Sequence, residues 1–356
     1  MPAILIPSCA DTGGMRVSSA PPPQRVSVAV RQFTSPGYAK LPAGDQGVRD
    51  FEQIYLAGKL LDRLGSSGQC SGAYFTAGPT AATDLTVDGE VIESDGKNLS
   101  LRIAVTRVDG KVVLNKKYNV SFQDAQVPSV KATLTGCVDR MAGEILATGL
   151  TTNINLHEAR FYAYVGNPSL PTNPAREKEA EAAGDIERHE LLLPVTKEFV
   201  PRARVTEPSY VQWISLSAPL VDQRKRAKAE KTSADIGQAL GAFTGAASFA
   251  AGMQMAQAGN TQGVALAQQN MATAEEIMTK EAARSEAAEN KIAAISSTLA
   301  GYKNTFATNQ YRQVTIRIYD KVIKVSGSLD QQLAEFRKVV KDSLNSKAAM
   351  DTAPKS

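Results

Sequence analysis

Apolar and polar residues alternate through three consecutive segments between Asp84 and Phe122. Such alternation is typical of half-buried strands, because successive side chains point to opposite faces of a sheet. Asp95-Gly96 and Asp109-Gly110 separate the three segments. Asp-Gly favours a hairpin turn because glycine adopts positive φ readily. The pattern therefore predicts a three-stranded antiparallel meander.

The segments on either side of the meander extend this prediction to an α/β (α+β) fold. Residues 25–33 place three valines on one face and predict a first strand, and residues 71–75 predict a short second strand. Residues 47–64 and 128–146 carry apolar side chains at helical spacing. The expected order is strand, helix, short strand, meander and helix, which gives a mixed sheet flanked by two helices.

This order and two motifs resemble a known family. The opening strand VSVAVRQF and the run that begins DLTVDGEVIESD are similar to the periplasmic domain of the CsgG, LpoB and PelC lipoproteins, whose fold is related to the N-terminal domain of TolB. Asp84, Gly89 and the turn Val108–Val112 stand at the places of the family motif. The resemblance covers residues 25–150 and implies a domain in the bacterial periplasm.

Residues 1–24 predict a lipid anchor followed by a tether. Ile6-Pro7-Ser8-Cys9 resembles the end of a bacterial lipoprotein signal, and a Gly, Ser and Pro-rich stretch follows. Acyl chains on Cys9 would anchor the protein at the outer membrane, since each buried methylene contributes about 0.8 kcal/mol. The alternative is an unstructured start that carries an unmodified cysteine.

Cys70 and Cys137 are the other two cysteines of the chain. With Cys9 lipidated, they form an even pair in an oxidising compartment, where a disulfide is expected. Two buried apolar thiols are an equally good interpretation.

Residues 151–233 predict a β-rich extension with a flexible loop. The segment 153–165 reads as a long strand, and residues 191–205 and 210–220 carry further β-type residues. Between them, Pro168, Pro171 and Pro174 indicate a loop.

Residues 234–302 predict a long helical hairpin rich in alanine and glycine. No charged residue occurs between Ile236 and Ala274. Gly237, Gly241 and Gly245 recur every fourth residue, so they share one helix face and allow another helix to approach closely. Helix packing between subunits, insertion into a membrane and pairing within the chain all fit this hairpin.

Residues 303–356 predict a C-terminal strand and helix. Residues 313–327 alternate as one long strand or as a hairpin that turns near Asp320, and residues 330–344 repeat apolar side chains at helical spacing. The tail after Asn345 is expected to be disordered.

Composition narrows the function classes. The chain has 356 residues, 40 basic and 36 acidic, and a net charge of +4, a bias too weak to predict a nucleic-acid partner. His157 and His189 are the only histidines, and no metal-ligand or catalytic motif includes them, so each is interpreted as a surface histidine or one with its hydrogen bonds satisfied, rather than as a ligand. The sequence predicts no enzyme activity, no metal and no cofactor.

The leading hypothesis is an outer-membrane-anchored periplasmic lipoprotein that forms an oligomer, and the resemblance to CsgG and PelC implies that this oligomer is a ring. Its partners would be further copies of itself and other envelope proteins in a machine for secretion, polymer export or motility. The alternative is a regulator that binds and activates a peptidoglycan synthase, as LpoB-like domains do.

Overall fold

The computed structural model describes residues 25–36, 43–150, 154–221, 286–302, 313–319 and 321–352. A mixed five-stranded sheet in the order β2-β1-β3-β4-β5 forms its centre. The strands are β1 (Ser27–Arg31), β2 (Gly72–Thr76), β3 (Leu85–Ser94), β4 (Asn98–Arg107) and β5 (Val112–Ser121). β1 pairs in parallel with β2 and β3, whereas β3, β4 and β5 are antiparallel.

The meander is confirmed, and its turns have the expected chemistry. Gly96 and Gly110 have φ of 86° and 83°, a region that glycine enters without steric cost. In the first turn, Asp95 Oδ1 accepts hydrogen bonds from the backbone amides of Lys97 at 2.8 Å and Asn98 at 2.6 Å. Such local bonds fix the turn and thereby the register of the hairpin.

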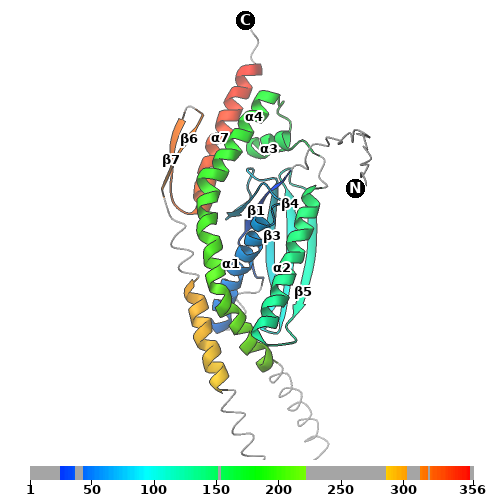
Figure 1. Ribbon diagram of the computed structural model, residues 1–356. Helices are drawn as coiled ribbons and strands as arrows, with labels where there is room; N and C mark the ends of the chain where they lie inside the picture. Colours follow the sequence, from blue (N-terminus) through cyan, green and yellow to red (C-terminus); the bar gives the residue numbers. More distant parts are fainter. Residues whose placement is uncertain are drawn as a thin grey trace, which may run out of the picture.

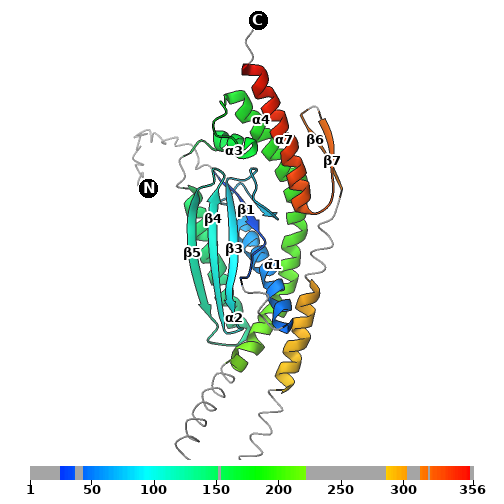
Figure 2. The ribbon, with the colours of Figure 1, turned by 180° about the vertical axis from the view of Figure 1, so that it is seen from behind.

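Two helices cover one face of the sheet, as the sequence predicts. They are α1 (Ala43–Ser66) and α2 (Val127–Leu150), and both lie on the same side of the strands in Figures 1 and 2. The apolar positions of the meander point to them, so that Val87, Leu101 and Ile103 are fully buried. Burial of this face is the main favourable term in folding.

The opposite face of the meander is polar and carries no helix (Figure 2). Cross-strand pairs cover it: Arg31 Nη1 lies 2.6 Å from Asp88, and Arg102 Nη1 lies 2.8 Å from Glu90. The α/β part is therefore a two-layer sandwich with one open sheet face.

The prediction of a β-rich extension over residues 151–233 is wrong, because the described part of this segment is helical. It forms α3 (Leu156–Val165), α4 (Pro174–Ile186), the π-helical turn η2 (Glu187–Leu192) and a further helix over residues 193–221. The expected strand over 153–165 is α3, which Asn155 caps by accepting from the amide of Glu158 and which Gly166 ends at a φ of 70°. These capping signals outweigh the β-propensity of its aromatic residues.

α4, η2 and residues 193–221 continue one another as a single long helix, here called the strut (Figure 1). The side chains that it buries recur alternately every fourth and third residue: Leu192, Thr196, Phe199, Ala203, Thr206, Tyr210, Trp213, Ser217 and Leu220. This spacing is that of a helix that packs along its whole length on a neighbour. Beyond Pro174 at its start, the strut contains Pro194, Pro201, Pro208 and Pro219, of which the last three are exposed. Proline on the outer face bends a helix toward the core without removing its packing.

The π turn has a local reason. Pro194 has no N–H to donate to the carbonyl of Glu190, and in an α-helix its ring clashes with that carbonyl. The amide of Leu193 bonds instead to the carbonyl of Arg188. This wider turn relieves the clash and is the usual form of a π segment within an α-helix.

The strut packs on α1 and on the edge strand β2. A Cβ on Gly58 of α1 would lie 2.5 Å from Cβ of Ala203, so glycine is needed where the two helices touch. The rings of Phe75 and Phe199 stack with centroids 4.0 Å apart. The hydroxyl of Thr196 accepts from the amide of Phe75 at 2.8 Å. The strut thus satisfies an amide of an edge strand that would otherwise be open to another chain.

The C-terminal part contains a hairpin and a helix. β6 (Val314–Ile318) pairs antiparallel with β7 (Lys321–Val325), which supports the hairpin over the single long strand. α7 (Leu329–Thr352) packs beside the hairpin and against α3 and α4 (Figures 1 and 2). The expectation of a disordered tail after Asn345 is wrong for residues 346–352, which continue α7.

Residues 286–302 form a helix, which agrees with the later part of the predicted helical hairpin. Gly237, Gly241 and Gly245 lie outside the described residues, as do Cys9 and the tether. Within the described ranges, no helix combines the length and apolarity that a bilayer crossing requires.

Candidate functional site

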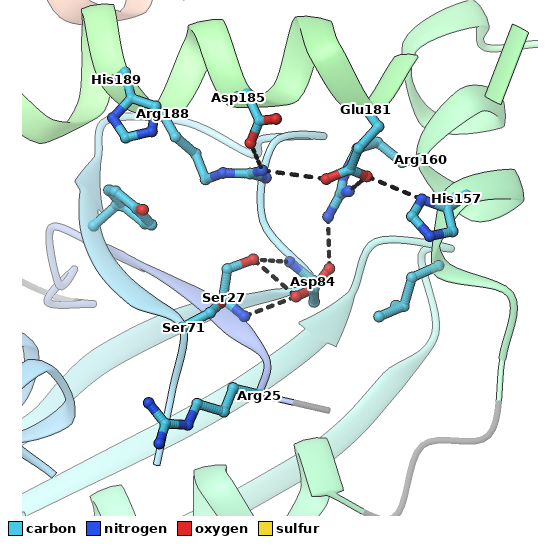
Figure 3. A pocket seen from close by; sticks show the side chains of 12 residues that line it. Arg25, Ser27, Ser71, Asp84, His157, Arg160, Glu181, Asp185, Arg188 and His189 are labelled. Atoms are coloured by element: carbon cyan, nitrogen blue, oxygen red, sulfur yellow. Dashed lines mark hydrogen bonds and ion pairs between the residues drawn. The ribbon is translucent and has the colours of Figure 1, made fainter. Parts of the chain in front are cut away.

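A pocket of about 380 Å³ lies where the first residues of β1, β2 and β3 meet the helical layer. Figure 3 shows its lining, in which strand and loop residues lie opposite side chains that project from α3, α4 and η2. The lining is almost entirely polar and comprises Arg25, Ser27, Ser71, Tyr74, Asp84, Leu156, His157, Arg160, Glu181, Asp185, Arg188 and His189.

Asp84, which belongs to the motif that precedes β3, is the centre of the inner part of the pocket. Its side chain is buried and accepts from the amide of Ser27 at 2.7 Å and from the Ser27 hydroxyl at 2.8 Å, both through Oδ2. Its Oδ1 accepts from Nη2 of Arg160 at 2.6 Å. Asp84 thus links the first residue of β1 to α3 (Figure 3).

Arg160 spans the gap between the sheet and the helical layer. It is only 3% exposed, its Nε donates to the carbonyl of Ala81 at 3.1 Å, and its Nη1 pairs with Glu181 of α4. Burial lowers the pKa of this guanidinium, whereas the carboxylate of Asp84 acts in the opposite direction. An arginine stays charged in proteins, so its buried charge is matched by two carboxylates.

The carboxylate of Glu181 interacts with two arginines and one histidine on the helical side of the pocket. Besides Arg160, it meets Arg188 Nη2 at 3.3 Å and His157 Nδ1 at 3.3 Å. Arg188 also pairs with Asp185 and donates to the carbonyl of Ala82. Each of the three carboxylates in the pocket therefore already accepts from an arginine.

Next to the pocket, Glu187 of the π turn forms a second polar cluster with no exposure at all. It accepts from the hydroxyls of Thr80 at 2.6 Å and Tyr164 at 2.8 Å, and from Arg337 of α7 at 3.1 Å. Burial raises the pKa of the Tyr164 phenol well above its usual range, and the carboxylate of Glu187 adds to this shift. This cluster, called the Glu187 anchor, joins the strut to α3, to α7 and to the loop before β3.

At the opposite end of the strut, Glu52 of α1 forms the Glu52 anchor. It is 1% exposed, pairs with Arg49 at 2.9 Å and accepts from Tyr210 of the strut at 2.7 Å and from the hydroxyl of Ser94. Burial raises the pKa of Glu52 despite the opposing effect of Arg49. The strut is therefore held to the sandwich through one buried carboxylate near each end.

The predicted disulfide is not formed, since Cys70 and Cys137 are both free, buried thiols. Cys70 donates its S–H to the carbonyl of Leu64 at 3.1 Å, and Cys137 lies on the buried face of α2. Burial raises the pKa of both thiols, which makes them unreactive. The interpretation as two small apolar core residues is the one that the structure supports.

The two histidines line the pocket. His189 is exposed, as expected of a surface histidine. His157 has a side chain that is 56% exposed, but it faces Glu181, a partner that the sequence did not indicate. Among the described residues, no group of three or more His, Cys, Asp or Glu side chains is arranged to hold a metal ion.

Comparison of the chain with protein-family models, with curated proteins and with solved structures found no match. The resemblance to the CsgG, LpoB and PelC lipoproteins stays a prediction from residues 25–150. The sequence singles out Asp84 as a motif residue, but it gives no indication of its partner Arg160. Nor does it indicate the buried or paired carboxylates Glu181, Glu187 and Glu52.

Proposed function

We propose that this protein is an outer-membrane-anchored periplasmic lipoprotein that serves as an oligomeric structural component of a cell-envelope assembly. The observation that supports the proposal is the element order of the sandwich. Strand, helix, short strand, meander and helix follow one another from β1 to α2, and the resemblance rests on that order. Cys9 carries the lipid in this proposal, and the partners are further copies of the chain and other envelope proteins.

The use of the buried charges also favours a structural role. Asp84, Glu187 and Glu52 each bind donors from elements distant in sequence. Such contacts fix the relative position of the strut and the sandwich, and a subunit that transmits load in an assembly needs this rigidity.

The meander face left open by α1 and α2 gives a specific reason to keep the alternative, a regulator that activates a peptidoglycan synthase. Its Arg31–Asp88 and Arg102–Glu90 pairs are partly exposed and present both charges to a protein partner. A monomer that binds a cell-wall enzyme through this face would favour the alternative.

Electron microscopy of the full chain, extracted from membranes in mild detergent, tests the proposal. A closed particle of many subunits supports it, and a monomer contradicts it. Metabolic labelling with a palmitate analogue tests the anchor separately: label on the native chain and none on Cys9→Ala is the expected result. Equal labelling of the two would show that Cys9 is not the lipid site.

A further inference from the structure

Four hydrogen-bond donors at the mouth of the pocket have no partner in the described part of the chain. They are the guanidinium of Arg25, the hydroxyl of Ser71, the phenol of Tyr74 and the ring of His189, all of which line the pocket. Arg25, Ser71 and His189 are exposed, and Tyr74 is half-buried. The network around Asp84, by contrast, forms the inner wall and is saturated (Figure 3).

Most carboxylate oxygens of the pocket are already engaged. Both oxygens of Asp84 and both oxygens of Glu181 accept from arginine or serine donors. Asp185 pairs with Arg188. A ligand that enters therefore meets unsatisfied donors, and the group that satisfies donors is an acceptor, best of all an oxyanion.

The donors come from both layers. Arg25 and Ser71 lie at the starts of β1 and β2, whereas His189 projects from η2 on the opposite wall (Figure 3). Tyr74 lies on the same face of β2 as Gly72, and a Cβ at position 72 would come within 2.5 Å of its phenol oxygen. The absence of a side chain at Gly72 thus lets the phenol reach back toward the mouth of the pocket.

We propose that the mouth of this pocket binds a small molecule through a phosphate or carboxylate group. The oxyanion accepts from Arg25 and its strand-side neighbours Ser71 and Tyr74, and the rest of the molecule lies toward His189 on the strut, because Figure 3 draws Arg25 and His189 on opposite sides of the lining. The volume of about 380 Å³ accommodates more than a bare ion, because pockets of this size hold whole small molecules.

The numbers of charged side chains in the lining indicate how the pocket selects an anion. Three arginines face three carboxylates in the lining, so net charge alone does not attract an anion. Binding relies instead on directed hydrogen bonds together with Arg25, the one arginine of the lining whose guanidinium has no ion pair with another described residue. The ligand contacts both layers, so its binding stabilises the docking of the strut.

The test is calorimetric titration of the full chain with inorganic phosphate, glycerol 3-phosphate and succinate, each against sodium chloride at equal ionic strength. At least one probe is expected to bind in a single class of sites. Arg25→Gln is expected to weaken that binding on the order of tenfold, since it removes a charge-assisted hydrogen bond. Arg317→Gln changes the same charge at an exposed position on β6 and is the matched control.

Gly72→Ala gives a second, independent variant. It displaces the Tyr74 phenol without altering any donor, and it is expected to weaken binding in the same direction as Tyr74→Phe. Urea unfolding of each variant confirms that the fold is retained; Arg25 is exposed, so its substitution is expected to leave the midpoint unchanged.

Two outcomes overturn the proposal. One is the absence of binding by all three probes into the millimolar range. The other is equal weakening by Arg25→Gln and Arg317→Gln, which would indicate a diffuse charge effect. Vesicles of phosphatidylcholine with and without phosphatidic acid distinguish the source: preference for the anionic vesicle assigns a lipid headgroup, and preference for soluble glycerol 3-phosphate assigns a free metabolite. Either preference supports the site if Arg25→Gln abolishes that preference, and contradicts it if the preference is retained.

Discussion

Both anchors attach the strut through a buried carboxylate, but the carboxylate comes from the strut in one anchor and from the sandwich in the other. In the Glu187 anchor the strut supplies the carboxylate, and three separate elements supply donors. In the Glu52 anchor the sandwich supplies the carboxylate together with Arg49 and Ser94, and the strut supplies only the phenol of Tyr210. The first anchor therefore depends on the strut for its charge, whereas the second keeps a paired carboxylate when the strut is detached.

Substitution of the carboxylate in the Glu187 anchor has the largest expected effect. Glu187→Ala leaves the donors of Thr80, Tyr164 and Arg337 without their acceptor, and loss of one partner of a buried ion pair costs about 3–5 kcal/mol of unfolding free energy. Urea unfolding monitored by tryptophan fluorescence measures it. Glu190→Ala, exposed on the same turn, is the matched control, for which about 0.5 kcal/mol or less is expected. Equal losses would show that the cluster is not an anchor.

Tyr210→Phe removes the only hydrogen bond that the strut gives to the Glu52 anchor and keeps the ring packing. A hydrogen bond to a charged group contributes about 1.5–3 kcal/mol, and Arg49 and Ser94 still satisfy the carboxylate, so a loss of about 1.5 kcal/mol is expected. Tyr162→Phe serves as the control. A double-mutant cycle with Glu52→Gln isolates the pair, and a coupling of zero would contradict the contact.

The smallest expected effect is the pH dependence that the Glu52 anchor adds to the stability of the fold. Burial raises the pKa of Glu52 in the folded state above its ordinary value of 4.5, so the folded protein binds this proton more tightly than the unfolded chain. The resulting stabilisation is complete below about pH 4.5 and is lost as pH rises through the raised pKa.

Unfolding free energies of the native chain and Glu52→Gln, measured from pH 4 to pH 7, test this sign. The native chain is expected to lose stability relative to the variant as pH rises. Carboxylates with a lowered pKa, such as Asp109 and Glu144, make the unfolding free energy rise with pH. They are present in both proteins, so their contribution cancels in the difference between the native chain and Glu52→Gln. A constant difference across the range would refute the assignment.

Much of the sandwich could be predicted because its signals are local. Alternation and two Asp-Gly turns specify β3, β4 and β5, and helical spacing specifies α1 and α2. The prediction fails in the strut, where the β-propensity of single residues disagrees with the helical spacing of the buried positions. Val205, Tyr210 and Trp213 are β-type residues, and the prolines of the strut look like breaks, but the alternating spacing of four and three from Leu192 to Leu220 was the stronger signal.

The polar anchors could not be found from sequence. Glu187 is fully buried and Glu190 is exposed, yet both sit in the same charged stretch. The difference arises from where Thr80, Tyr164 and Arg337 are brought by the tertiary fold. Asp84 was singled out only through its motif, and its partner Arg160 lies 76 residues further along the chain.

The π turn has a geometric consequence for both anchors. On a regular α-helix each residue advances by about 100°, so Glu187 and Tyr210 would point about 140° apart. One extra residue absorbed by a π turn reduces this angle to about 40°. The turn at Glu187–Leu192 thus acts as a phase correction that aligns two distant side chains on one side of the strut. Deletion of the absorbed residue would restore a regular helix with the same phase, whereas deletion of one residue elsewhere between Glu187 and Tyr210 would turn the two anchors by about 100° relative to each other, so that only one of them could close.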